Sequence, residues 1–534
     1  MKFKFLLLFA ATTLFFKGYA SPVGSDYDGR IKEKEILTPM PAPTPKINGA
    51  KIYGARPMRD FIYRIPCQGT RPITFTVSGL PEGMSVDSNG IITGKTPAKE
   101  GEYKMVITAK NSHGSVTRDF SLIVGDKIAL TPPTGWNSWG GYMLYVTDDV
   151  MRSVTDFFVD KGLADVGYQY LGIDDCWMKI SQEEYDALPD NIVNKKHAGF
   201  DYSKVTGEPR DIEGNILPNS TFPDMKALTD YIHSKGLKMG IYSSPGDQTC
   251  QKREGSRYYE SLDAKQYAAW GIDLLKYDMC SGGEVYKAIQ QEQPNYRQFN
   301  FWQPMASAIK NQSRDIVFNL CQYGAEDPWL WAPELDIQSW RSTGDLNHNV
   351  KNYFNSAVTI ATKLRDYNKP GQWNDPDFMY IHHIRKAGSM GEPSVEIPLN
   401  TNERYQYATL WSIVCAPYFF SCDIDVIDEF TIRLLSNSTL MNINQDELTH
   451  TAEVVRDADD EVVMVKNLAD GTKAVAVFNK DAENEANIQV LWSEFDSCCE
   501  KEVYDAWREK SIGTFKGGIT TTLSPNGVAL YIVK

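Results

Sequence analysis

Three stretches with different hydrophobic patterns follow one another along the chain. Between residues 46 and 126, short apolar runs such as Ile73–Val77 and Tyr103–Thr108 are separated by turn sequences such as Asp87–Gly90. Strands at this spacing predict a small β-sandwich of immunoglobulin type. From 127 to 445, apolar strand-like runs alternate with helical stretches, which predicts a parallel (β/α)8 TIM barrel. Runs such as Lys473–Phe478 predict an antiparallel β-domain over 446–534.

The N-terminal 45 residues have a different character. Lys2 and Lys4 precede the apolar run Phe5–Phe16, and small residues stand at positions 18 and 20. This pattern predicts a signal peptide over 1–20, and the run is shorter than the roughly 20 residues that span a membrane. Residues 21–45, with four prolines within Leu37–Pro45, are interpreted as a Pro-rich linker. We therefore expect an exported protein, periplasmic or extracellular, without a membrane anchor.

Composition narrows the classes of partner. The chain of 534 residues carries 55 Lys and Arg against 69 Asp and Glu, a net charge of −14, which argues against nucleic acid. Seven histidines are present and no two lie three or four residues apart, so we expect no histidine metal site and no cofactor. Nine cysteines suit an exported chain, and the odd number leaves at least one thiol free.

Carboxylates and tryptophans recur at the ends of the predicted barrel strands. In a TIM barrel the chemistry is carried by the carboxyl ends of the strands. Aromatic rings stack on the apolar faces of sugars, and acids bind hydroxyls or act in acid/base catalysis. The pattern indicates a carbohydrate site. The segments concerned are Gly135–Trp139, Asp174–Trp177, Lys276–Cys280, Cys321–Gly324, Trp340–Asp345 and Trp373–Asp377.

The fourth predicted strand is the most informative. Side chains two residues apart share a face, so Lys276 and Asp278 point together while Tyr277 points away. A lysine beside an aspartate favours the ionised carboxylate, and an oriented carboxylate can attack an anomeric carbon. From the strand alone, a purely structural ion pair stays open.

The chain resembles glycoside hydrolase family 27, the α-galactosidases (melibiases) and α-N-acetylgalactosaminidases. The resemblance covers about residues 127–534 and leaves out the N-terminal sandwich. The matching segments are Gly135–Trp139, Ile173–Trp177, Phe222–Met225, Lys235–Tyr242, Trp270–Asp278, Trp340–Asp345, Trp373–Asp377 and Ile443–Asp446.

The resemblance implies retaining hydrolysis of terminal α-D-galactosyl residues of oligosaccharides or glycans. It implies Asp278 as nucleophile, Asp345 as acid/base and a disulfide between Cys250 and Cys280. For Asp377, a cap or turn at a strand end stays open as the alternative. The implied substrate-binding residues are Trp136, Asp174, Asp175, Lys276, Gln322, Arg341 and Asp377.

Two departures from the family pattern leave alternatives open. The fifth strand often ends Cys-Glu-Trp in the family but has Cys321, Gln322 and Tyr323 here, which puts the specificity at the sugar 2-position in question. The same mechanism on β-L-arabinopyranosides or α-N-acetylgalactosaminides is the alternative. Inserts at 181–220 and 381–402 are candidates for shaping subsites or a homo-oligomer contact.

Two further interpretations belong to other classes. A non-catalytic carbohydrate-binding protein would tolerate loss of Asp278 or Asp345, and both are present. A metal-dependent lyase or hydrolase would use Asp174 and Asp175, but neighbouring strand residues point to opposite faces and make a poor joint ligand set.

Overall fold

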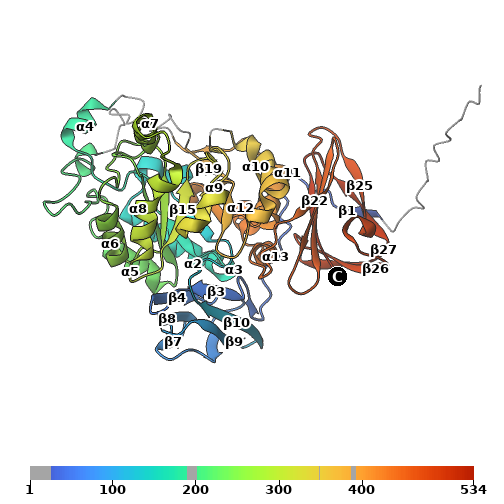
Figure 1. The fold of residues 1–534 in the computed structure, drawn as a ribbon. Helices are drawn as coiled ribbons and strands as arrows, with labels where there is room; N and C mark the ends of the chain where they lie inside the picture. Colours follow the sequence, from blue (N-terminus) through green and yellow to red (C-terminus); the bar gives the residue numbers. More distant parts are fainter. Residues whose placement is uncertain (1–25, 189–200, 348, 386–392) are drawn as a thin grey trace, which may run out of the picture.

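The computed structural model describes residues 26–188, 201–347, 349–385 and 393–534. It contains a central barrel, a blue N-terminal β-domain against one end and an orange-red C-terminal β-domain at the side (Figure 1). The predicted signal peptide lies outside the described residues. No helix in the described ranges is long and apolar enough to cross a membrane.

The barrel is one parallel sheet curled on itself. Seven strands pair in chain order, and β21 (Tyr418–Ser421) pairs with the first of them and with β18 (Met379–Tyr380). Because β18 follows β17 after only three residues, the two behave as halves of one interrupted strand, and the ends of the sheet meet through them. The seven are β11 (Thr134–Asn137), β12 (Tyr170–Gly172), β13 (Lys238–Ser243), β14 (Leu274–Asp278), β15 (Val317–Cys321), β16 (Ser339–Arg341) and β17 (Trp373–Asp375).

Helices cover the outside of the barrel. Polar side chains cap several of them: Thr147 accepts a hydrogen bond from the Val150 amide at the start of α2, and Asn400 forms a capping box with Glu403 at the start of α11. The main helices are α2 (Asp148–Asp160), α3 (Leu163–Val166), α5 (Met225–Ser234), α6 (Glu260–Trp270), α7 (Gly282–Glu292), α8 (Gln298–Lys310), α9 (Pro328–Trp331), α10 (Tyr353–Thr359), α11 (Thr401–Ile413), α12 (Glu429–Leu435) and α13 (Ser438–Asn444).

The N-terminal domain is the predicted β-sandwich. One sheet has the order β3-β10-β9-β6 and the other β4-β8-β7, with a core of its own between them. Its strands are β2 (Lys46–Ile47), β3 (Ile52–Ala55), β4 (Asp60–Arg64), β5 (Cys67–Gln68), β6 (Thr74–Ser78), β7 (Met84–Val86), β8 (Ile91–Lys95), β9 (Gly101–Asn111) and β10 (Gly114–Val124).

This domain packs against the amino ends of the barrel strands. Arg56 pairs with Asp315 at 3.0 Å, just before β15, and Tyr53 contacts the ammonium of Lys238, the first residue of β13. In Figure 1 it lies opposite α4 (Gln182–Ala187) and α7. The sandwich therefore closes the floor of the barrel and leaves the carboxyl ends of the strands open.

The C-terminal domain combines a six-stranded sheet, β22-β23-β24-β29-β26-β27, with a three-stranded sheet, β1-β28-β25. The strand β1 (Asp26–Asp28) comes from the predicted linker and pairs in parallel with β28. Figure 1 draws it in blue among the orange-red strands. The others are β22 (Glu453–Asp457), β23 (Glu461–Asn467), β24 (Lys473–Asn479), β25 (Ala486–Leu491), β26 (Glu500–Asp505), β27 (Lys510–Lys516), β28 (Gly518–Leu523) and β29 (Val528–Val533).

The described part of the predicted linker is anchored to the barrel helices at several points. The Leu37 amide donates to the hydroxyl of Tyr405 on α11, and Arg433 on α12 donates to the Thr38 carbonyl. Segment 26–45 therefore joins the C-terminal domain to the barrel before the chain enters the N-terminal sandwich.

Candidate active site

A pocket opens at the carboxyl ends of the barrel strands and encloses about 670 Å³ including its mouth. Side chains from most of the strand ends meet in it, as the parallel topology requires. Most of the residues predicted to act in catalysis or substrate binding line this pocket together, and only Trp136 and Gln322 do not. The lining consists of Trp139, Asp174, Asp175, Tyr242, Cys250, Gln251, Lys276, Asp278, Tyr323, Arg341, Asp345, Asn347, Asp377 and Tyr380.

Asp278 lies at the base of the pocket, at the end of β14. Its neighbour Tyr277 packs on the other side of the strand against Trp302 of α8, as the strand alternation predicts. The Asp278 carboxylate accepts a hydrogen bond from the Tyr323 hydroxyl at 2.9 Å and a longer one from Tyr242 at 3.4 Å. Burial raises the pKa of Asp278, while the Lys276 ammonium and the Tyr323 hydroxyl oppose that rise.

Lys276 ties two strand ends together. Its ammonium lies 2.7 Å from the Asp174 carboxylate and 3.9 Å from that of Asp278. Burial works against the charged form, but the two carboxylates outweigh it and raise the pKa of Lys276. Lys276 therefore remains a cation between two anions.

Asp175 has a different set of partners from its neighbour Asp174. Its carboxylate accepts from the Thr249 hydroxyl at 2.8 Å and from the Gln251 amide at 2.9 Å. Burial nevertheless raises the pKa of Asp175 to about 6. Because Asp174 is committed to Lys276 and Asp175 to the 249–251 loop, the two are not arranged as a joint metal-binding pair.

Arg341 organises the opposite wall. Its guanidinium lies 3.1 Å from Asp345 and 3.2 Å from Asp377, and it is buried. Asp377 also accepts from the Leu346 amide at 2.7 Å, and burial raises its pKa to about 7 against the effect of Arg341. Asp377 is thus a brace for the Arg341–Asp345 wall as well as a pocket residue.

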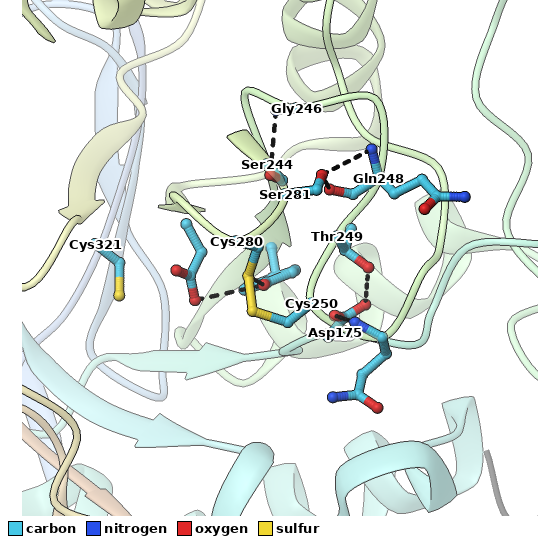
Figure 2. Close-up of a disulfide and its surroundings, with 12 residues drawn as sticks. Asp175, Ser244, Gly246, Gln248, Thr249, Cys250, Cys280, Ser281 and Cys321 are labelled. Atoms are coloured by element: carbon cyan, nitrogen blue, oxygen red, sulfur yellow. Dashed lines mark hydrogen bonds between the residues drawn. A yellow bond between two sulfur atoms is a disulfide. The ribbon is translucent and has the colours of Figure 1, made fainter. Parts of the chain in front are cut away.

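The disulfide between Cys250 and Cys280 joins two loops of the site, with the two Cα atoms 4.8 Å apart. Figure 2 shows it beside the hydrogen bond from Thr249 to Asp175. The Tyr242 hydroxyl lies 3.1 Å from the Cys280 sulfur. The disulfide thus links two parts of the site: the loop whose groups hydrogen-bond to Asp175, and the segment that follows Asp278. In the described residues, one cluster of three or more His, Cys, Asp or Glu side chains is compact enough to hold a metal ion, namely Cys250, Cys280 and Asp278. Both sulfurs of this cluster are already bonded to each other in the disulfide.

Backbone strain gathers at these strand ends. Cys176, Cys280, Tyr323 and Asp377 have φ angles of 80°, 26°, 66° and 101°, a region that non-glycine residues rarely adopt. Such outliers persist where surrounding contacts hold them, and they cluster at functional sites.

The structure places two predicted binding residues elsewhere. Trp136 is fully buried beside the pocket, where its indole N–H donates to the Cys422 carbonyl and its ring packs on Tyr142. Gln322 is buried as well, and its amide group donates to the Ala325 carbonyl of its own loop. Neither lines the pocket.

Several lining residues were not among the predicted ones. Trp139 and Tyr323 stand in strand-end segments that were already singled out, and Tyr242 lies one residue before the end of β13, so the strand-end criterion could have found them. Tyr380 follows the interruption between β17 and β18. The hydrophobic pattern of the sequence does not indicate this interruption, so it could not predict Tyr380 as a lining residue. Gln251 enters the site on a loop that is held by the disulfide and by its own amide hydrogen bond to Asp175.

The inserts flank the pocket. Within 181–220, Arg210 pairs with Asp263 of α6 at 2.7 Å and with Glu254, next to the disulfide loop. Within 381–402, β19 (His383–Ile384) pairs with β20 (Val395–Glu396), and the Arg385 amide donates to the Gly140 carbonyl, one residue after Trp139. Each insert supports a segment that contributes a lining residue. Residues 189–200 and 386–392 lie outside the described ranges.

Comparison with known proteins agrees with this architecture. Family models for alpha galactosidase A, for the alpha galactosidase C-terminal beta sandwich domain and for an Ig domain match residues 180–446, 458–533 and 53–125. An alpha-galactosidase of Cyamopsis tetragonoloba is 32% identical over 459 residues, 84% of this chain and 97% of that protein.

Solved structures extend the likeness to 94% of the chain. A Bacteroides fragilis structure assigned as an alpha-galactosidase/melibiase is 29% identical with a TM-score of 0.80, and it covers 94% of this chain and 100% of its own. A β-L-arabinopyranosidase of Geobacillus stearothermophilus shares the fold at 22% identity and a TM-score of 0.62, over 76% of this chain and 97% of its own. With its barrel, its flanking β-domains and its carboxylate-lined pocket, the chain is a glycoside hydrolase and belongs to the alpha-galactosidase (melibiase) family, glycoside hydrolase family 27.

Proposed function

We propose that the protein is a retaining exo-glycosidase that releases terminal α-D-galactosyl residues from oligosaccharides or glycans. The observation that carries the proposal is the pairing of two carboxylates of different exposure in one pocket. The Asp278 side chain is 8% exposed at the base, whereas that of Asp345 is 34% exposed. A nucleophile needs a fixed, dry position, and an acid/base group needs access to the leaving group and to water.

The first half of the reaction forms a glycosyl-enzyme. A carboxylate oxygen of Asp278 attacks the anomeric carbon while the bond from that carbon to the aglycone oxygen breaks. Asp345 gives its proton to the departing oxygen and becomes a carboxylate, with Arg341 at 3.1 Å to compensate its charge. The product of this half is an ester between the sugar and Asp278.

The second half returns the enzyme to its starting state. Asp345 takes a proton from water as the water oxygen attacks the anomeric carbon, and the ester bond breaks with its electron pair left on Asp278. Two inversions give net retention. Proton NMR of early products should therefore show α-galactose first, and early β-galactose would contradict the assignment.

The role of Asp345 is tested by the leaving group. General acid catalysis contributes about 10²–10⁴-fold and matters little when the leaving group needs no proton. Asp345→Ala should therefore lose most kcat/KM on natural galactosides and keep most of it on dinitrophenyl galactoside. Equal losses on both substrates would mean that Asp345 only binds.

The preference for galactose rests on the relatives and on the acidic half of the pocket. By resemblance, Asp174 and Lys276 bind the axial 4-hydroxyl, and Asp175 or its neighbours meet the 6-hydroxyl. A site that hydrogen-bonds a hydroxyl rejects analogues without it, because its buried polar groups are left unpaired. We expect kcat/KM to be highest for the aryl α-galactoside and lower for both the arabinopyranoside and the N-acetylgalactosaminide. A higher kcat/KM for either rival aryl glycoside would redirect the specificity and leave the mechanism standing.

We also propose export, by way of the predicted signal peptide. Its basic start, apolar run and small residues at 18 and 20 support this. Mass spectrometry of the protein recovered outside the cytoplasm of the producing cell should give a chain that begins at Ser21.

A further inference from the structure

Tyr323 enters the site through an unusual turn. Strand β15 ends at Cys321, Gln322 turns into its own loop, and Tyr323 follows with φ at 66°. The residue is 38% exposed, yet its hydroxyl lies 2.9 Å from Oδ1 of Asp278. A bulky residue with positive φ is rare, and here the turn brings the hydroxyl to the buried carboxylate.

The turn is held from both sides. Gly324 follows with φ at 84°, and a side chain added there would lie 2.7 Å from the Ser342 carbonyl oxygen, which only glycine avoids. The Arg341 guanidinium lies 5.7 Å from the Tyr323 ring centre. The position of the Tyr323 hydroxyl is therefore built into the packing of β15 against β16.

The two oxygens of Asp278 have different partners. Oδ2 faces the Lys276 ammonium at 3.9 Å and the Tyr242 hydroxyl at 3.4 Å, whereas Oδ1 accepts from Tyr323. A carboxylate that is held through both oxygens cannot rotate freely about its last bond.

We propose that Tyr323 is a positioning residue for the nucleophile, and that its hydroxyl fixes the orientation of Asp278 and keeps it ionised. This rests on the proposed role of Asp278. Where the family often carries tryptophan, this chain carries a phenol, whose hydroxyl makes the contact with Asp278.

The surroundings of Asp278 show why another donor matters. Among the residues that the structure describes, the cation paired with Asp278 is Lys276, and this cation is shared with Asp174. The other titratable groups around it are the carboxyl of Asp345, the Cys321 thiol and the hydroxyls of Tyr242 and Tyr323. The sulfur of Cys280 is tied in the disulfide and does not titrate.

Tyr323 itself acts as a hydrogen-bond donor throughout. Burial and the neighbouring Asp278 raise the pKa of Tyr323, so the phenol keeps its proton at any working pH. It therefore moves no proton in the reaction. The Tyr323 hydroxyl must therefore act through Asp278. It stabilises the ionised carboxylate before attack, and it stabilises the same carboxylate again as it leaves the sugar during hydrolysis of the ester.

Two kinetic signatures follow for Tyr323→Phe. Loss of a hydrogen bond to the ionised Asp278 should raise its pKa, and the acid limb of the kcat/KM profile should move to higher pH by about one to two pH units. Because the carboxylate regains its charge as the ester breaks, deglycosylation should slow most. On dinitrophenyl galactoside, kcat and KM should then fall together, with a burst of dinitrophenol.

The matched control is Tyr380→Phe. Tyr380 lines the same pocket, and the charged groups that act on its hydroxyl are Asp377, Asp345, Arg341 and Asp174, so the acid limb set by Asp278 should coincide with that of the unchanged enzyme whatever the level of activity. Tyr323→Met, which also lacks a donor, serves if the phenylalanine variant fails to fold. Thermal melts of all variants show which are folded.

The outcomes separate the inference from the proposed function. Incubation with 2,4,6-trinitrophenyl 2-deoxy-2,2-difluoro-α-galactoside, whose ester is hydrolysed slowly, followed by peptide mass spectrometry, tests for the ester on Asp278 in the unchanged enzyme. No adduct there would overturn the proposed function. An adduct on Asp278, together with an unshifted acid limb in folded Tyr323→Phe, would overturn the positioning role alone.

Discussion

Replacing Lys276 by methionine tests the electrostatics of the whole site. The change removes the cation that lies 3.9 Å from Asp278 and 2.7 Å from Asp174 and keeps an unbranched side chain of similar length. At 3.9 Å and an effective dielectric constant of about 20, one pair of unit charges interacts by about 4 kcal/mol. That corresponds to a rise of up to about three units in the pKa of Asp278.

The sign of the effect on activity follows from the ionised form that attack requires. The acid limb of kcat/KM reports the free nucleophile, so a higher pKa of Asp278 moves this limb to higher pH. The loss of kcat/KM in Lys276→Met should thus be largest in acid and shrink as the pH rises. The assay is kcat/KM for an aryl α-galactoside between about pH 4 and pH 9, the range in which these groups titrate.

Stability should respond with the opposite pH dependence. With the ammonium gone, Asp174 and Asp278 are buried charges without a cation, a defect of about 3–5 kcal/mol at neutral pH. Protonation removes both charges, so the difference in Tm between Lys276→Met and the unchanged enzyme should narrow as the pH falls. Lys276→Arg keeps the charge and is the control. An acid limb that stays in place in Lys276→Met would refute the electrostatic account of Asp278.

Three further changes probe the framework of the site. Replacing Cys250 and Cys280 by serine opens a loop of 30 residues. In the chain-entropy model this should lower the free energy of unfolding, measured by urea titration, by about 3–4 kcal/mol. An unchanged urea midpoint would mean that packing alone holds the loop. Arg56→Met removes the cation that pairs with two aspartates at the barrel floor, and it should lower the free energy of unfolding by about 2–4 kcal/mol while kcat stays unchanged. A lower kcat with an unchanged Tm would contradict a purely structural role for this floor. Gly324→Ala should shift the acid limb as Tyr323→Phe does, because the added Cβ displaces the turn; a normal pH profile would show that the turn adapts.

Much of this protein can be inferred from its sequence by itself. The three hydrophobic patterns predict the order and class of the domains, because strand and helix periods differ and are local properties. The residues that end barrel strands, among them Asp174, Lys276, Asp278, Arg341 and Asp345, can be assigned to one site from the order of strands and helices. Parallel strands in a barrel all end at the same face, so position at a strand end is enough to bring these side chains together.

The tertiary structure decided what lies beyond the strand ends. Once a strand stops, the direction of the next side chains depends on the turn, and periodicity carries no information about it. Thus Gln322 turns into its loop, whereas Tyr323, with φ at 66°, reaches Asp278. Long-range pairing is equally invisible locally: residues 26–28, interpreted as linker, complete a sheet with β28, close to the other end of the chain. Both depend on contacts between segments far apart in sequence, which only the packed chain specifies.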